Sequence, residues 1–233
     1  MTRRHPAVDQ VAAVAIALGE LRDRVVFIGG AIAPLLQTDP PFPRARATSD
    51  VDGVVMTSTY AEAQKLQDQL AAAGFRRDLA DPRQIHRWIS PNGIPFDLVP
   101  TGEHLGGTGN PWDVLAIETA VETTLDDGIT VRHASAPAFL ALKWAAHHDR
   151  GRDDPRSSHD LEDLLALAAS RPSLLAEVAA APRQLREHLA KQTRAFLDDP
   201  AIDELLFCHL NNAQDPAHTV AGVRAVLEQM AGE

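Results

Sequence analysis

The stretch Val25-Val26-Phe27-Ile28-Gly29-Gly30, together with the later Thr48-Ser49-Asp50-Val51-Asp52, decides the fold of this chain. The apolar residues 25–28 predict a buried strand that ends in a tight glycine turn. A second apolar run, residues 51–56, predicts a further strand that carries the aspartates. A glycine turn after one strand and alternating carboxylates on the next are typical of a site that binds phosphate groups and a divalent metal.

The glycine pair leads into residues 31–36, which we interpret as a short helix starting on the turn. Free backbone N–H groups and the positive end of the helix dipole would then face an anion. Neither GxxxxGK[ST] nor GxGxxG occurs in the chain, so it has no P-loop and no dinucleotide-binding fingerprint. A plain turn remains an alternative interpretation of Gly29-Gly30.

The aspartates provide the chemistry. Residues i and i+2 of a strand lie on the same face, so Asp50 and Asp52 converge while Val51 is buried on the other face. Two close carboxylates repel each other unless a cation lies between them, and Mg²⁺ or Mn²⁺ accepts such oxygen ligands. Asp97, in the apolar strand expected at 94–99, would be a third carboxylate, enough for a two-metal site. The alternative makes Asp50 a turn residue, Asp52 an edge charge and Asp97 the partner of an arginine.

The rest of the pattern divides the chain into an α/β domain, residues 1–135, and an α-helical domain, residues 136–233. In the first domain we expect helices at 8–22, 59–73 and 115–122, and strands at 84–89, 94–99 and 129–133. Thr57, Ser58 or Thr59 would cap the second of these helices. In the second domain we expect helices at 137–149, 158–169, 173–197, 201–210 and 217–231.

Composition limits the partners. The chain has 233 residues, a formal net charge of −10, and apolar and charged contents of 45% and 23%. Such a surface does not attract nucleic acid or anionic membranes as a whole, so a polyanionic substrate needs a local basic patch or a metal. The single cysteine, Cys208, excludes an intrachain disulfide. No apolar run has signal-peptide character or membrane-spanning length, so we expect a soluble, cytoplasmic protein with no membrane partner.

Taken together, Gly29-Gly30, the Thr48 to Asp52 segment and Asp97 resemble the nucleotidyltransferase superfamily, whose fold is that of DNA polymerase β. Three further features resemble its AbiEii-type branch, which contains toxins of type IV toxin–antitoxin systems. They are an arginine before the D-x-D segment (Arg44 or Arg46), a helix bearing Lys143, and the segment His159-Asp160-Leu161-Glu162-Asp163-Leu164. The resemblance spans residues 20–170.

The resemblance implies an α/β (α+β) nucleotidyltransferase-fold domain, with a mixed sheet and flanking helices, followed by an α-helical domain that completes the active-site groove. It implies Mg²⁺-dependent transfer of a nucleoside monophosphate from a nucleoside triphosphate, with RNA or tRNA as the acceptor and a cognate antitoxin as a partner. The implied catalytic residues are Asp50, Asp52, Asp97, Lys143 and Asp160, of which the first three are metal ligands. The implied nucleotide-binding residues are Gly29, Gly30, Arg46, Thr48, Ser49 and Lys143.

One departure from the superfamily pattern matters for the phosphates. Many members have Gly-Ser, whose hydroxyl contacts phosphate, whereas here Gly29-Gly30 is followed by Ala31. Phosphate binding is then left to backbone N–H groups and to arginine or lysine side chains. Lys143 lies in an almost wholly apolar helix, where the alternative to a phosphate contact is a lysine that extends its ammonium to solvent at the helix edge.

Three other functions stay open at this stage. An antibiotic-modifying nucleotidyltransferase, acting on an aminoglycoside or lincosamide, fits the acidic net charge. A catalytically silent nucleotide-binding or regulatory module would use the same fold. The His147-His148-Asp149 and His159-Asp160 pieces suggest an HD-type phosphohydrolase, which would also need an upstream histidine such as His104 or His133.

Overall fold

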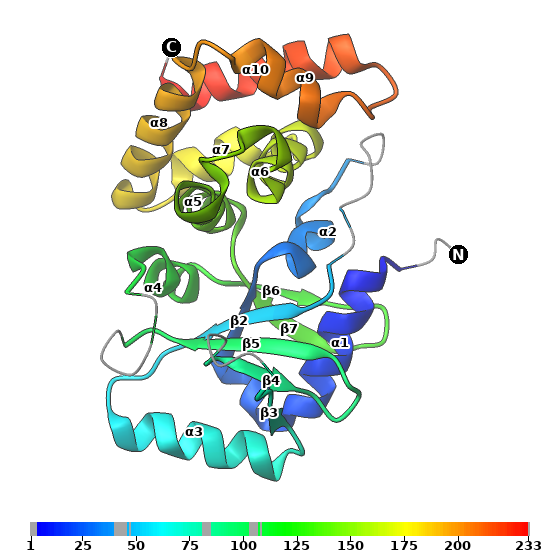
Figure 1. Ribbon diagram of the computed structural model, residues 1–233, viewed down its shortest axis with the longest axis vertical. Helices are drawn as coiled ribbons and strands as arrows, with labels where there is room; N and C mark the ends of the chain where they lie inside the picture. Colours follow the sequence, from blue (N-terminus) through cyan, green and yellow to red (C-terminus); the bar gives the residue numbers. More distant parts are fainter. Residues whose placement is uncertain are drawn as a thin grey trace. The chain divides into compact units, whose positions relative to one another are not determined.

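A computed structural model describes residues 4–39, 46, 48–80, 85–102, 107 and 109–232. The described strands form one mixed sheet in the order β3-β4-β5-β2-β1-β7-β6 (Figure 1). Their bounds are β1 Val25–Ile28, β2 Val51–Val55, β3 Arg76–Arg77, β4 Arg87–Ile89, β5 Pro95–Pro100, β6 Val121–Thr124 and β7 Thr130–His133. The mixed α/β class expected from the sequence is confirmed.

The strand order places β2 in the middle of the sheet. It runs parallel to β5 and antiparallel to β1, and β1 in turn runs parallel to β7. The pairs β3–β4, β4–β5 and β6–β7 are antiparallel. Because β2 has a neighbour on both sides, Asp52 is not on an edge strand.

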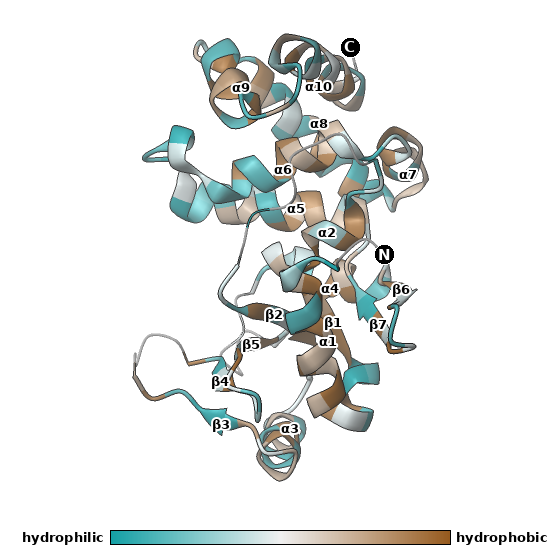
Figure 2. Cartoon of the chain, turned by 90° about the vertical axis from the view of Figure 1, so that its right-hand side faces the viewer, coloured by the Kyte–Doolittle hydropathy of each residue, from teal (hydrophilic) through white to brown (hydrophobic). Residues whose placement is uncertain are grey.

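One face of the sheet is apolar and forms the core of this region. Phe27 and Phe96 are fully buried, with ring centroids 6.4 Å apart, and Phe75 packs 5.8 Å from Phe96. Val51 is also fully buried, as its alternation with the two aspartates predicted. Figure 2 shows the hydrophobic colour concentrated along β1, in keeping with a strand covered by other elements.

The helices around the sheet are α1 Pro6–Leu18, α2 Ala33–Leu36, α3 Tyr60–Ala72 and α4 Pro111–Glu118. The Thr59 side chain accepts the N–H of Glu62, which confirms the predicted cap of α3. The helix expected at 8–22 ends at Leu18 instead, because Gly19 takes a positive φ of 57°. The helix expected at 115–122 is also wrong in its bounds: Asn110 caps α4 early, and residues 121–124 pair with β7 as strand β6.

The remaining helices are α5 Ala136–Ala146, α6 His159–Ser170, α7 Leu174–Ala180, α8 Arg183–Leu197, α9 Ile202–Leu210 and α10 Pro216–Ala231. The helix expected at 173–197 is two helices, because Pro182 interrupts the backbone hydrogen bonding between α7 and α8. The helix expected at 137–149 ends as α5 at Ala146 and continues as a π-helical turn, His147–Gly151.

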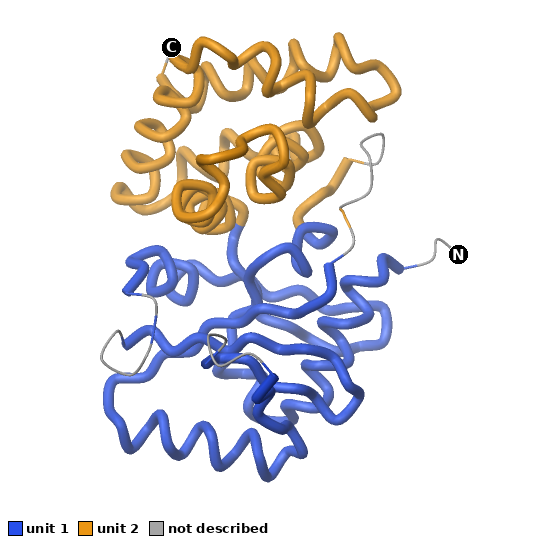
Figure 3. The backbone as a smooth tube through the Cα atoms, viewed as in Figure 1, with its two compact units in different colours: residues 1–35, 47–135 blue, residues 36–46, 136–233 orange. Residues whose placement is uncertain are grey.

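The chain divides into two compact units, residues 1–35 with 47–135, and residues 36–46 with 136–233 (Figure 3). The described part of the 36–46 segment is held by the second unit through its backbone. Thr38 and Asp39 donate their N–H groups to the Ser170 carbonyl, and Arg171 donates to the Leu36 carbonyl at 2.7 Å. None of the described helices combines the length and the apolar character needed to cross a bilayer.

Candidate active site

A row of paired positions crosses four strands of the first unit. Ile28 of β1 is paired with Asp52 of β2, Asp52 with Asp97 of β5, and Asp97 with Arg87 of β4. Paired residues of neighbouring strands lie on the same face of a sheet. The sheet therefore sets Asp52, Asp97 and Arg87 side by side, with Gly29 next to them at the end of β1.

Gly29 is required at this place for two separate reasons. Its φ of 72° and ψ of −169° lie in a region that is essentially restricted to glycine. A Cβ atom on Gly29 would lie 2.0 Å from Oδ2 of Asp52, well inside contact distance. The glycine turn and the second aspartate are thus in direct contact, as the sequence pattern suggested.

The short helix expected after the glycines is present, but it has too few residues for its N-terminus to bind an anion through a helix dipole. Gly30–Ile32 is a 3₁₀ turn, and α2 that follows has only four residues. The dipole of so short a segment is small, because few peptide units are aligned. Any phosphate bound here would depend on individual N–H groups of the turn.

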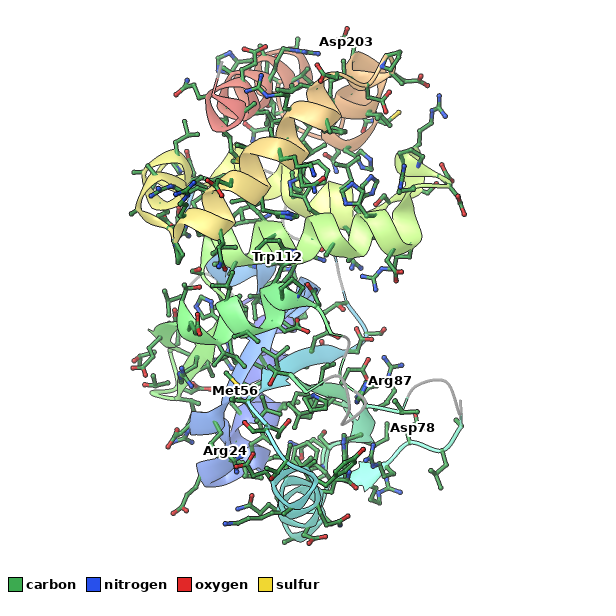
Figure 4. All side chains as sticks on the ribbon, turned by 90° about the vertical axis from the view of Figure 1, so that its left-hand side faces the viewer. Arg24, Met56, Asp78, Arg87, Trp112 and Asp203 are labelled. Atoms are coloured by element: carbon green, nitrogen blue, oxygen red, sulfur yellow. The ribbon has the colours of Figure 1, made fainter. Side chains whose placement is uncertain are left out.

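Arg87, labelled in Figure 4, binds two of these aspartates, and the sequence interpretation did not assign it to the site. Its Nε donates to Oδ1 of Asp97 at 2.8 Å and its Nη2 to Oδ2 at 2.6 Å. The same Nη2 donates to Oδ2 of Asp50 at 2.7 Å. The hydrogen bonds to Asp97 raise the pKa of Arg87 above its ordinary value, with the charge of Asp50 adding to the effect.

This ion pair matches the alternative in which Asp97 is the partner of an arginine. The sequence held one signal for it: a carboxylate in an apolar strand needs a cation, and the neighbouring expected strand contained Arg87.

Asp50 lies directly before β2 and is held from both sides. The hydroxyl of Thr48 donates to its Oδ1 at 3.0 Å, while Arg87 binds its Oδ2. Ser49, between them, is exposed. Thr48 therefore orients a carboxylate in this structure, whereas the resemblance made it a nucleotide-binding residue.

The carboxylate oxygens of Asp50, Asp52 and Asp97 are ligands of the kind that Mg²⁺ prefers. As the side chains lie, however, the Arg87 guanidinium bridges Asp50 and Asp97. Over the described ranges, no group of three or more His, Cys, Asp or Glu is arranged to hold a metal ion. The chemistry of the three aspartates fits a divalent cation, and their present arrangement with Arg87 does not.

A second cluster of charges is buried within the second unit, around Lys143. Its Nζ donates to Oδ1 of Asp160 at 3.1 Å and to Oδ2 of Asp163 at 2.6 Å, and its side chain is only 5% exposed. This burial excludes the alternative in which Lys143 extends its ammonium to solvent. Arg150 donates twice to Asp160, at 2.9 and 3.0 Å. Arg46 lies 3.5 Å from Asp163.

The two carboxylates of the cluster are stabilised by its cations. Burial opposes the charge of Asp160, but the hydrogen bonds from Arg150 and the charge of Lys143 outweigh it and lower the pKa of that carboxyl. Asp160 and Asp163 therefore both hold the ammonium of Lys143, and Asp163 was not selected from the sequence. Arg44, the other arginine considered before the D-x-D segment, lies outside the described residues.

Among the described residues, the histidines considered for an HD-type site are not gathered as metal ligands. His147 forms a 2.8 Å hydrogen bond with Ser158, and burial lowers its pKa. His159 is exposed and lies 3.4 Å from Glu162. His133 belongs to β7, where its Nε2 bonds with Thr123 at 2.9 Å. His104, also considered for an HD-type site, lies outside the described residues.

Comparison with known proteins finds similar chains among solved structures. No protein-family model matches the chain, and no curated protein matches it. Among solved structures, the chain is similar to one titled "Crystal structure of putative nucleotidyltransferase from H. pylori", with 12% sequence identity and a TM-score of 0.47. The alignment covers 99% of this chain and 96% of that one.

Proposed function

We propose that this protein is a nucleotidyltransferase, which moves a nucleoside monophosphate from a nucleoside triphosphate to a hydroxyl or phosphate oxygen of an acceptor. The observation that carries the proposal is the row in which Gly29 lies against Asp52, with Asp97 on the neighbouring strand. Only glycine fits at position 29, because the Asp52 carboxylate occupies the space that a Cβ atom would need. The glycine turn and the aspartate therefore depend on each other. A structural turn alone would not need Asp52 at that position.

In the proposed reaction the acceptor oxygen attacks the α-phosphate in line and pyrophosphate leaves. The chain contributes by positioning and by charge, which dominate catalysis of phosphorus-group transfer. The turn at Gly29 and Gly30 offers N–H groups to the leaving phosphates, and Asp97 orients or deprotonates the acceptor. A divalent cation, Mg²⁺ or Mn²⁺, would supply the positive charge that lets Asp50 and Asp52 approach the triphosphate.

Lys143, Asp160 and Arg46 enter the proposal through the family resemblance. In the second unit the ammonium of Lys143 is already bound by two carboxylates. The resemblance gives Lys143 the neutralisation of triphosphate charge, Asp160 its orientation and Arg46 a contact to the nucleotide. In the structure all three take part in ion pairs within the second unit.

We propose RNA or tRNA as the first candidate acceptor, because the Lys143 and Asp160 motifs resemble the toxin-like branch. The same resemblance leads us to propose a cognate antitoxin as a partner. A small polyamine acceptor, such as an aminoglycoside, is the second candidate. The observation that favours it is charge: the chain carries a formal net charge of −10, which attracts a polycation.

The test incubates the protein with one α-³²P-labelled nucleoside triphosphate at a time, with Mg²⁺, and with either total RNA or an aminoglycoside mixture. Asp52→Asn removes the charge at the site without changing its size. Asp68→Asn makes the same change on the exposed face of α3, where the Asp68 carboxylate accepts a hydrogen bond from the Gln64 side chain. We expect label on RNA with the wild type and Asp68→Asn, and none with Asp52→Asn. Full labelling by Asp52→Asn would disprove the assigned site, and labelling of neither acceptor would support the silent module.

A further inference from the structure

A cavity of about 440 Å³ lies within the second unit, and its walls come from the end of α6, the start of α7 and one face of α10 (Figure 1). A volume of this size is typical of sites for small molecules. None of the described residues that line it belongs to the row of aspartates or to the Lys143 cluster. On α6, the lining residue Ala168 follows Asp160 by eight positions, which is about 12 Å along the helix axis.

One side of α10 faces the cavity and combines polar and apolar positions. Positions three and four residues apart lie on the same side of a helix. The residues of α10 and its cap that line the cavity have this spacing: Asp215, His218, Thr219, Gly222, Val223 and Val226. Val223 and the facing Leu174 of α7 are each only 1% exposed, so the inner wall of the cavity is apolar.

Gly222 leaves the α10 wall of the cavity open. Glycine in the interior of a helix is less stable than alanine, because it loses more backbone freedom on folding. A Cβ atom at Gly222 would meet no atom within 4 Å, so packing of the described chain does not require a glycine there. A large side chain at this position would instead occupy the cavity.

Two carboxylates at the exposed rim are not paired within the chain. Asp39 and Asp215 both line the cavity and are exposed to solvent. Asp215 accepts the backbone N–H of His218 at 3.1 Å as the cap of α10. Among the described residues, neither carboxylate has an ion-pair partner.

Arg171 brings a positive charge to the described part of the wall, but that charge is already bound. Its Nε donates to Oε1 of Glu177 at 2.8 Å, and its Nη1 donates to the Leu36 carbonyl at 2.7 Å. Because Glu177 takes up the charge of Arg171, Asp39 and Asp215 leave the rim negative. A negative rim over an apolar inner wall favours a ligand that is a cation at one end and apolar at the other.

We propose that this cavity binds a small organic amine, with its apolar body against Leu174 and Val223 and its ammonium group at the rim with Asp39 and Asp215. An ammonium group offers three N–H donors, and its hydrogen bonds to carboxylates are strengthened by charge. The site is separate from the proposed transfer reaction. Its tests contain no nucleotide and no acceptor, so they do not depend on that function.

Three probes with the same phenyl body and different head groups test the class of ligand: 2-phenylethylamine, 2-phenylethanol and 3-phenylpropionate. Each is titrated into the ¹⁵N-labelled full chain, and the shifts of the α10 amide signals give its Kd. We expect the amine to bind with a Kd below about 1 mM, and at least about tenfold more tightly than the alcohol or the carboxylate. No shift of the α10 signals with the amine, or equal or tighter binding of either other probe, overturns the proposal.

Removing the rim charges tests the part assigned to the carboxylates. The double variant Asp39→Asn, Asp215→Asn loses both charges, while asparagine at 215 still caps α10. It should bind the amine no more tightly than the alcohol. The control double variant, Asp153→Asn with Asp198→Asn, loses two exposed carboxylates outside the cavity and should bind as the wild type does. A preference for the amine that survives in the first variant contradicts the proposal.

Filling the cavity from Gly222 tests the place of binding. Gly222→Leu should weaken binding of both the amine and the alcohol at least about tenfold, whereas Gly222→Ala, which adds one methyl group, should stay within about twofold of the wild type. Equal binding by the two variants would refute the assigned cavity. If Gly222→Leu does not fold, the methyl signals of Leu174 and Val223 in the wild type locate the amine. Shifts of both signals support the proposal, and shifts confined to other parts of the chain overturn it.

Discussion

Replacing Gly29 with alanine tests the contact between the glycine turn and the aspartate. The new Cβ would lie 2.0 Å from Oδ2 and 2.8 Å from Cγ of the Asp52 side chain. The backbone at Gly29 strongly disfavours a Cβ, so we expect a loss of about 1–3 kcal/mol in the free energy of unfolding. The clash adds a second effect, because the Asp52 carboxylate must rotate away from its place in the row.

The matched control is Gly19→Ala. Gly19 has a φ of 57° and a ψ of −128°, and a Cβ there would meet no atom within 4 Å. Both substitutions therefore strain the backbone, and only Gly29→Ala moves Asp52. Urea unfolding should show a loss of stability of about 1–3 kcal/mol for Gly19→Ala, and at least as large a loss for Gly29→Ala because of the added clash.

The decisive difference is in binding of metal and nucleotide. One interaction with a charged group contributes about 1.5–3 kcal/mol, so displacing Asp52 should weaken Mn²⁺-dependent nucleotide binding by roughly 10- to 100-fold. Isothermal titration calorimetry measures this nucleotide affinity, at a temperature where both variants are folded. Gly19→Ala should bind as the wild type does. Equal binding by Gly29→Ala and Gly19→Ala would refute the argument that Gly29 exists to accommodate a working Asp52.

Two further predictions concern the second unit. Lys143→Met leaves Asp160 and Asp163 without their buried cation and should lower the free energy of unfolding by about 3 kcal/mol. Lys191→Met, at an exposed position of α8, should change the free energy of unfolding by less than about 0.5 kcal/mol. Similar urea midpoints for the two variants would contradict the importance of the cluster for stability. Burial, with the charges of His148 and Lys191, lowers the pKa of His188 to about 4. Since the unfolded chain takes up this proton first, stability should fall as the pH drops from about 6.5 towards 4, by about 1–2 kcal/mol after allowance for partial exposure. His188→Gln should reduce this fall between pH 7.5 and 5, and an unchanged fall would argue against a half-buried, neutral His188.

The elements that the sequence predicted well are those with a local physical cause. The apolar run before Gly29 forms β1, and the alternation around Val51 buries that residue while its neighbours face the site. Thr59 caps α3 because its hydroxyl meets an N–H within the same turn. Each of these depends on residues only a few positions apart.

The features that escaped prediction depend on register or on weak local signals. Arg87 contacts Asp97 because β4 and β5 are antiparallel neighbours. It also contacts Asp50, which directly precedes β2. The sequence shows the three residues but not which strand lies next to which. Strand β6, Val121–Thr124, is mostly exposed and lies at one end of the strand order, so it lacks the apolar alternation that identifies buried strands.

The most direct test of the central claim is the fate of the label in α-³²P- and γ-³²P-labelled nucleoside triphosphate, measured with the wild type and with Asp52→Asn. A nucleotidyltransferase moves the α-phosphate to the acceptor and releases the γ-phosphate in pyrophosphate. The account predicts acceptor labelled from the α position alone, and no labelled acceptor with Asp52→Asn. Label arriving from the γ position, or transfer that persists in Asp52→Asn, would contradict it.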